Sequence, residues 1–279
     1  METQSRTLIV SGAELTYVEQ GTGDPVVFVH GSLGDYRNWG FQTEPFSQRY
    51  RMIACSRRRH WPNAWPEDNR ECAVATHAAD LAALIDALGV GPAHLVGNSY
   101  GAMTVLDMAA RRPELVRTMV LGEPPLLPWL AESSDDSLLF TDFLTNAWNP
   151  AGLEFRRGDS EAGVRLFIDG VLGEGGFDRL PAPAKARMMD NAPSFGIELE
   201  SPPETYYSSL THDDVKLIQI PTLLVTGEVS PRMFIRVIEQ LAHTLPAAER
   251  AEIANTSHAM YAGNPDAFNE AVLAFLARN

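Results

Sequence analysis

The 279-residue sequence has few cysteines and few basic residues, and each shortage excludes a class of protein. Two cysteines, Cys55 and Cys72, are too few for a disulfide framework and lack the spacing of a metal site, so we expect both to be reduced thiols. Lys and Arg total 22 against 36 Asp and Glu, which gives a formal net charge of −14. Because nucleic acids and anionic membranes are bound by clustered basic residues, this charge argues against both partners.

Long apolar runs are also missing. No stretch approaches the 18 or so apolar residues that a membrane-spanning helix needs. The N-terminal segment METQSRTLIVSG holds only a short apolar run, too short for the core of a signal peptide. These features predict a cytoplasmic enzyme, either a monomer or a homodimer.

Short apolar runs alternate with helix-like segments along much of the chain. The expected strands are residues 6–10 and 14–19, which form a hairpin, followed by 25–29, 51–55, 93–96, 116–122, 220–227 and 248–254. The expected helices are residues 36–50, 72–88, 102–112, 231–241 and 265–277, with Asp80 and Asp86 on exposed positions of the second. This order predicts an α/β fold, a mostly parallel eight-stranded sheet with helices on both faces.

Residues 126–212 break the alternation. They are rich in Pro, Ser, Gly and acidic residues, with helix-like pieces at 137–148 and 184–189 and no clear strand. We therefore predict a helical cap, or lid, over a core of residues 1–125 and 213–279. Most aromatic side chains of this insertion should pack the insertion itself, and a minority should face a ligand. We expect Trp129 and Trp148 among the substrate-binding residues.

The segment Gly97-Asn98-Ser99-Tyr100-Gly101 joins an expected strand directly to an expected helix. Such a turn strains the central residue and crowds the positions on either side, which suits Gly97 and Gly101. It would hold the Ser99 hydroxyl at a helix N-terminus, where the Tyr100 N–H favours negative charge on a substrate oxygen. This pattern predicts that Ser99 is a catalytic nucleophile.

A second glycine-rich segment, residues 30–34, follows the strand at 25–29. Its backbone can approach a ligand closely, so the Ser32 N–H is expected to be the second donor to an oxyanion. We expect His30 and Leu33 beside the substrate. The run Arg57-Arg58-Arg59, followed by His60 and Trp61, has two open interpretations, a solvated surface or part of the site.

A serine hydroxyl needs a base to take its proton and a carboxylate to orient that base. Among seven histidines, His258 lies in a loop after the last strand, which fits the order nucleophile, acid, histidine. His94 lies within a strand and should be packed. His77, His212 and His243 fall in helical or inserted segments with no evident reason to reach Ser99.

The elbow at Ser99, the His30-Gly31 loop and Ser257-His258 together resemble the serine branch of the α/β-hydrolase superfamily over nearly the whole chain. In that family the acid is commonly an Asp after the seventh strand, but Ser230 stands at that position here. A minority of the family carries the acid after the sixth strand, and Glu123 stands at that position. This placement of the acid is similar to that of zearalenone-type lactonases. The resemblance thus implies Glu123 as the acid, with Glu228, Asp213 and Asp214 as alternatives.

The resemblance implies acyl transfer to water without a cofactor or metal, because a serine replaces the nucleophilic Asp of dehalogenases and epoxide hydrolases. The expected substrate is a small, largely hydrophobic ester or lactone. The same fold also hosts C–C bond hydrolases, lyases and cofactor-free peroxidases, as well as ligand receptors that keep the triad. These alternatives remain open at this point.

Overall fold

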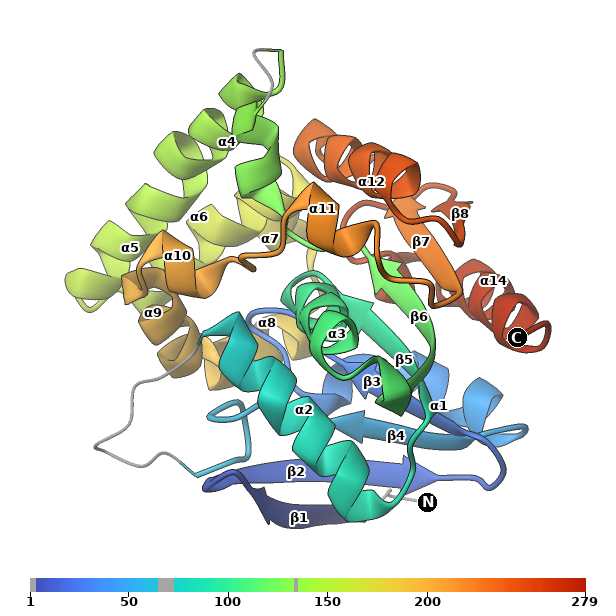
Figure 1. Cartoon of the computed structure of the whole chain (residues 1–279). Coiled ribbons are helices and arrows are strands. Elements are labelled where there is room, and N and C mark those ends of the chain that lie inside the picture. The colour runs from blue at the N-terminus through green and yellow to red at the C-terminus, as the bar shows by residue number, and fades with distance from the viewer. Residues whose placement is uncertain (1–3, 65–72, 133–134) are drawn as a thin grey trace.

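The computed structural model describes residues 4–64, 73–132 and 135–279, so Cys72 lies outside the described residues. One eight-stranded sheet runs through the molecule in the order β1-β2-β4-β3-β5-β6-β7-β8 (Figure 1). The strands are β1 Ser5–Val10, β2 Ala13–Gln20, β3 Pro25–Val29, β4 Arg51–Cys55, β5 Ala93–Asn98, β6 Val116–Gly122, β7 Thr222–Gly227 and β8 Ala248–Ile253.

The sheet is mostly parallel, as predicted. β1 pairs antiparallel with β2, and β2 pairs antiparallel with β4, while every pairing from β4 to β8 is parallel. The opening hairpin turns at Ser11 and Gly12, both with positive φ. Parallel strands end on the same side of the sheet, so the segments after β3, β5, β6 and β7 meet at one edge.

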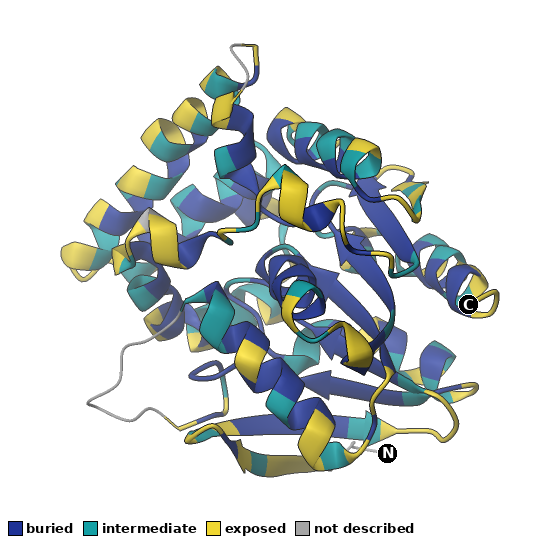
Figure 2. Ribbon diagram, in the orientation of Figure 1, coloured by how far each residue is buried: buried dark blue, intermediate teal, exposed yellow. Residues whose placement is uncertain are grey.

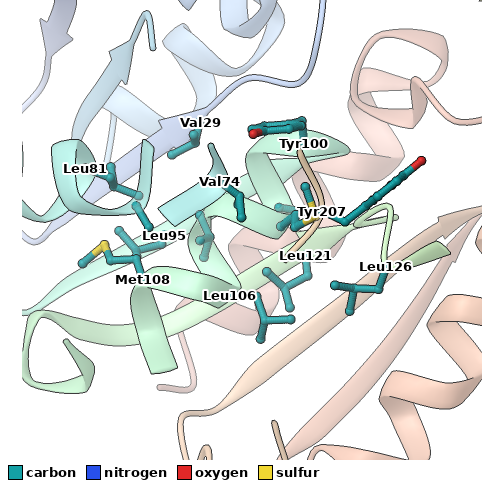
Figure 3. Packing of buried hydrophobic residues seen from close by; sticks show 14 of the residues in the cluster. Val29, Val74, Leu81, Leu95, Tyr100, Leu106, Met108, Leu121, Leu126 and Tyr207 are labelled. Carbon is teal, nitrogen blue, oxygen red and sulfur yellow. The ribbon is translucent and has the colours of Figure 1, made fainter. Parts of the chain in front are cut away.

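Apolar residues alternate between the two faces of the central strands. Val27, Leu95 and Leu121 belong to one hydrophobic cluster, shown in part in Figure 3, whereas the neighbouring Phe28 and Val96 belong to the other. Strands buried on both faces read as continuous apolar runs, which is why these segments were recognisable from the sequence. Figure 2 shows the central strands buried along nearly their whole length and β1 largely exposed at the edge.

Helices cover both faces. Apolar side chains of α2 Val74–Leu88, α3 Tyr100–Arg111 and α12 Arg232–Thr244 pack in the first cluster. Those of α1 Gly40–Ser47 and α14 Pro265–Leu276 pack in the second. Three short helices complete this part of the fold, namely the 3-10 helices η1 Tyr36–Trp39 and η2 Pro113–Leu115 and helix α13 Met260–Gly263.

The segment between β6 and β7 is helical, as expected, and lies over one end of the sheet in Figure 1. It consists of η3 Leu127–Glu132, α4 Ser137–Phe143, the π-helix η4 Leu144–Trp148, α5 Asn149–Arg156, α6 Ser160–Leu172, α7 Gly176–Arg179, α8 Ala182–Asp190, α9 Ala192–Glu200, α10 Pro203–Tyr206 and α11 His212–Val215. We call these elements the insertion helices. No helix among the described residues is long and apolar enough to cross a bilayer.

Several local predictions need correction. The helix expected at residues 36–50 is a 3-10 turn followed by a shorter α-helix that ends at Ser47. Asp86 is exposed as predicted, but Asp80 is buried because its carboxylate accepts hydrogen bonds from the Arg58 guanidinium, one of them 2.7 Å long. Cys55 is a buried free thiol whose pKa burial raises to about 12, which makes it unreactive.

Candidate active site

Ser99 lies between β5 and α3, in the strained turn that its sequence predicts. Its backbone has φ 54° and ψ −127°, and its N–H donates to the Gly122 carbonyl at 2.7 Å. A Cβ on Gly97 would lie 2.6 Å from the Ala102 backbone nitrogen, and one on Gly101 would lie 2.1 Å from the Val29 carbonyl oxygen. Only glycine fits at these two positions, so the flanking pattern is a steric requirement of the turn.

Ser99 and His258 line the same cavity, which has a volume of about 90 Å³. Core residues form one wall of it, the insertion helices form another, and the loop after β8 completes it. The lining residues are Gly31, Ser32, Leu33, Asn38, Asn98, Ser99, Phe167, Ile168, Val171, Leu172, Leu180, Ala184, Arg187, Met188, His258, Ala259, Tyr261 and Ala262. The cavity is therefore mostly apolar, with most of its polar groups from the core side and Arg187 from helix α8.

His258 bonds to Glu123. The Nδ1 atom of His258 lies 2.6 Å from Glu123 Oε2, and both side chains are buried. A carboxylate accepts but does not donate, so the proton of this hydrogen bond belongs to Nδ1, and in the neutral imidazole Nε2 then carries the lone pair. Within the described residues Nε2 has no hydrogen-bond partner. This arrangement leaves His258 able to accept a proton from a group in the cavity.

Glu123 is held from β7 as well. Its Oε1 accepts hydrogen bonds from Thr226 Oγ1 at 2.7 Å and from the Gly227 N–H at 2.9 Å. Burial by itself raises the pKa of Glu123, but the hydrogen bond from His258, its charge when protonated and the hydrogen bond from the Gly227 N–H together lower it, so the pKa lies below its usual value. Glu123 also has positive φ, 45°, directly after β6. The carboxylate is thus kept ionised and fixed in direction.

The alternative acids lie elsewhere. Glu228 is exposed, and its carboxylate accepts from the Asn255 N–H at 2.7 Å. Asp213 pairs with Lys216 on the surface, and Asp214 accepts from the Thr211 hydroxyl at 2.6 Å. No hydrogen bond joins any of the three to His258 within residues 4–64, 73–132 and 135–279.

Phe234 of α12 supports the imidazole from one face. The two rings stack with centroids 3.9 Å apart and an interplanar angle of 15°. Such a contact limits how far the ring of His258 can tilt while Glu123 fixes its rotation. No sequence motif points to Phe234, although the apolar face of its amphipathic helix was recognisable.

Ser32 and Tyr100 were expected to supply the two backbone donors to an oxyanion. Ser32 lines the cavity, and its hydroxyl lies 3.3 Å from the Tyr206 hydroxyl. Tyr100 is the first residue of α3, so its backbone N–H lies at the positive end of that helix. Negative charge that develops on a substrate oxygen beside Ser99 would be stabilised at this helix end.

The basic run after β4 is neither solvated nor part of the cavity wall. Arg57 is buried and donates to Glu198 Oε1 of α9 at 3.0 Å and to the Gly31 carbonyl at 3.2 Å. Its guanidinium also lies 3.1 Å from the Nε2 atoms of His60 and His77. The run therefore forms a polar support behind the loop that carries Ser32. It connects that loop to the insertion helices.

Leu33 lines the cavity, whereas three other residues expected at the substrate do not. His30 is buried, with its Nε2 accepting from the Arg57 N–H at 2.9 Å. Trp129 donates to the Leu210 carbonyl at 2.9 Å and packs on His212. Trp148 packs against Phe167 and Tyr206. His30 bonds within the core, and both tryptophans pack in the insertion.

Sequence reasoning missed most of the apolar wall. Residues Phe167, Ile168, Val171 and Leu172 of α6 line the cavity. Their three- and four-residue spacing was the available signal, because it places them on one face of a helix. His94 is packed as expected, with Nδ1 2.8 Å from the Thr118 hydroxyl. Among the described residues, no group of three His, Cys, Asp or Glu side chains is arranged to hold a metal ion.

The chain is similar to several known proteins. The chain is 28% identical over 283 residues to the non-heme haloperoxidase of Rhodococcus erythropolis, covering 95% of this chain and 96% of that one. It is 32% identical to the uncharacterized hydrolase YraK of Bacillus subtilis, over 47% of this chain and 48% of that protein. The solved structure described as Est816, an N-acyl homoserine lactone degrading enzyme, matches with a TM-score of 0.77 and 26% identity over 97% of this chain and 100% of that one.

Residues 24–265 match the sequence family described by its alpha/beta hydrolase fold. The matched region begins just before β3 and runs into α14, so it includes the Ser99 elbow, Glu123, His258 and all the insertion helices. The eight-stranded, mostly parallel sheet with helices on both faces is the architecture of the same family. The chain belongs to the alpha/beta-hydrolase fold family.

Proposed function

We propose that this chain is a serine hydrolase that cleaves a carboxylic ester or lactone of a small, largely hydrophobic molecule through an acyl-enzyme. One observation supports the proposal most directly: Ser99 and His258 line one cavity, and the Nδ1 atom of His258 is hydrogen-bonded to Glu123. In this assignment Ser99 is the nucleophile, His258 the base and Glu123 the orienting acid.

In the first step His258 Nε2 takes the hydroxyl proton while Ser99 Oγ attacks the substrate carbonyl. The Tyr100 and Ser32 backbone N–H groups stabilise the oxyanion of the tetrahedral intermediate. The intermediate collapses, and the His258 proton passes to the leaving alcohol. Water, activated by the same histidine, then attacks the acyl-enzyme and releases the carboxylic acid together with the free Ser99 hydroxyl.

The cavity favours a small substrate. A volume of about 90 Å³ holds only a compact acyl group, and residues 126–212, which we propose as the cap, form its apolar wall. A macrocyclic lactone would require the cap to move outward. The apolar lining of α6 supports an acyl chain rather than a sugar or a phosphate.

A hydrolysis panel with a serine-reactive phosphonate label tests this function. We expect aryl esters with short acyl chains to be hydrolysed and Ser99 to be labelled. Failure to hydrolyse any ester or small lactone, with Ser99 unlabelled, would sink the proposal. Turnover without a covalent acyl-enzyme would favour the lyase alternative, and slow single turnover with tight ligand retention would favour a receptor.

The haloperoxidase relative favours a second candidate, transfer of the acyl group to hydrogen peroxide instead of water. Attack of peroxide on the acyl-enzyme would release a peracid and restore the Ser99 hydroxyl, with no change of oxidation state in the protein. The ratio of peracid to acid formed in the presence of peroxide distinguishes the two acceptors. A product mixture that contains only acid rejects this candidate.

A further inference from the structure

Helix α8 contributes a charged side chain, that of Arg187, to the lining of the Ser99 cavity. Ala184, Arg187 and Met188 all line that cavity, and their spacing places them on one helical face. Arg187 is only partly exposed. It brings the one permanent positive charge to a cavity whose described lining residues include no Asp or Glu.

Arg187 has no partner for its charge in the part of the chain that the structure describes. Within residues 4–64, 73–132 and 135–279, its guanidinium forms no ion pair or hydrogen bond. The carboxylates of neighbouring elements are already bound. Asp190, three residues along in α8, pairs with Arg37 at 2.8 Å, and Asp35 accepts from Arg37 at 2.7 Å and from Asn191 at 2.7 Å.

Tyr261 adds a hydrogen-bond donor to the same cavity. Its hydroxyl oxygen accepts a hydrogen bond from Asn38 Nδ2 at 2.9 Å, and its own proton has no acceptor among the described residues. Burial raises the pKa of Tyr261, and the positive charge of Arg187 acts in the opposite direction. The phenol and the guanidinium line the same cavity, and both present donors without an acceptor among the described residues.

We propose, resting on the ester hydrolase function above, that Arg187 and Tyr261 form an anion subsite, and that the preferred substrates are small esters whose acyl chain ends in a carboxylate. The ester carbonyl would lie at Ser99, and the carboxylate would accept hydrogen bonds from the Arg187 guanidinium and the Tyr261 hydroxyl. The chain between the two groups would contact Ile168 and Val171 of α6, which are apolar cavity residues. This arrangement calls for a monoester of a short dicarboxylic acid.

Two esters of nearly equal size isolate the charge. Monoethyl glutarate carries a terminal carboxylate, and ethyl 5-oxohexanoate replaces one carboxylate oxygen with a methyl group and is neutral. We expect the parent enzyme to prefer the charged ester, chiefly through a lower KM. In Arg187→Gln the kcat/KM for the charged ester should fall roughly tenfold or more, because a charge-assisted hydrogen bond is lost. The neutral ester should change by less than about twofold.

Two further variants sharpen the comparison. Arg187→Lys keeps the charge and should recover part of the preference, although it loses the bidentate geometry of the guanidinium. Arg156→Gln is the matched control, since Arg156 is an exposed arginine of α5 outside the cavity lining and its loss changes the net charge by the same amount. It should leave both esters unaffected.

Equal kcat/KM for the two esters in the parent, or an unchanged ratio in Arg187→Gln, would overturn the anion subsite while leaving the hydrolase function standing. If the parent hydrolyses neither ester, the panel and the phosphonate label decide the hydrolase function, and binding decides the subsite. Calorimetry of monoethyl glutarate with Ser99→Ala, with and without Arg187→Gln, should then show weaker binding in the double variant. Equal binding by both proteins rejects the subsite.

Discussion

Glu123 Oε2 lies 2.6 Å from His258 Nδ1, although 135 positions separate the two residues in the sequence. The remaining oxygen of Glu123 is bound by Thr226 and Gly227 at the end of β7. β7 therefore supplies hydrogen-bond donors to the carboxylate, while Ser230 stands where an acid after β7 would be expected. Glu123 directly follows β6, and the donors that hold its carboxylate belong to the neighbouring strand β7.

The role of this pair predicts the effect of removing the charge. Glu123→Gln should lower kcat by about four decades, because a neutral amide no longer favours the His258 tautomer with Nδ1 protonated or stabilises its cationic form. The measurement is kcat at saturating ester. Glu228→Gln is the control and should retain nearly full kcat, since Glu228 is exposed and binds only the Asn255 N–H. If Glu228→Gln lost most of its kcat while Glu123→Gln kept it, Glu228 and not Glu123 would be the acid.

Ser99→Ala should abolish both ester hydrolysis and phosphonate labelling. Loss of a triad serine typically costs about six decades in turnover, and the oxyanion donors retain only a small remainder. The thermal unfolding midpoint should stay close to that of the parent, because the change removes one partly exposed hydroxyl and leaves the flanking glycines in place. Appreciable hydrolysis by the purified variant would contradict the nucleophile assignment.

Local patterns carried most of what could be predicted about the fold. The hairpin, the buried strands and the elbow each depend on residues close together in the chain, so their periodicity or steric demands are visible in the sequence. The burial of Asp80 was not visible, because it depends on Arg58 from a loop after another strand. The helical pattern placed Asp80 on the exposed face, but its ion pair with Arg58 lies in the interior.

The pocket shows the same limit. Trp148 was expected at the ligand because it is a large aromatic in the insertion, yet it packs on Phe167 and Tyr206, and Phe167 lines the cavity instead. The packing of the helices decides which of two adjacent aromatic residues faces a cavity. Residue type alone does not predict it. The Arg57–Glu198 pair was equally hidden, since its members lie 141 positions apart.

The size of the cavity predicts how acyl chain length affects the rate. Specificity should rise by about fourfold per methylene, equivalent to about 0.8 kcal/mol, only until the small cavity is full. Ile168→Ala should move this limit to longer chains, because it removes part of the apolar wall. The measurement is kcat/KM from acetyl to octanoyl esters.

Leu138→Ala provides the matched control for that series. Leu138 is an exposed apolar residue of the insertion, on α4, and is not part of the cavity lining. It should reproduce the parent profile at every chain length. An identical profile in Ile168→Ala would show that α6 does not form the acyl pocket.

The Arg57–Glu198 ion pair predicts how stability depends on pH. Burial raises the pKa of Glu198, but the charge of Arg57 and the hydrogen bond of His60 outweigh it and lower the pKa to about 2. A carboxylate with a depressed folded-state pKa contributes stability above its unfolded pKa, and that stability is lost as the pH falls through the folded value. The drop from 4.5 to about 2 corresponds to about 3 kcal/mol at neutral pH.

Glu198→Gln should therefore lower the free energy of unfolding by about 3 kcal/mol at neutral pH, also because it leaves the buried Arg57 without a counter-ion. The difference from the parent should narrow steadily from about pH 4.5 to about pH 2, where the parent carboxylate also becomes neutral. Urea unfolding over this pH range measures it. Glu154→Gln breaks a surface pair with Arg157 and should cost less than about 1 kcal/mol. A difference for Glu198→Gln that stays constant with pH, or equals that of Glu154→Gln, would show that this buried carboxylate does not stabilise the fold through its charge.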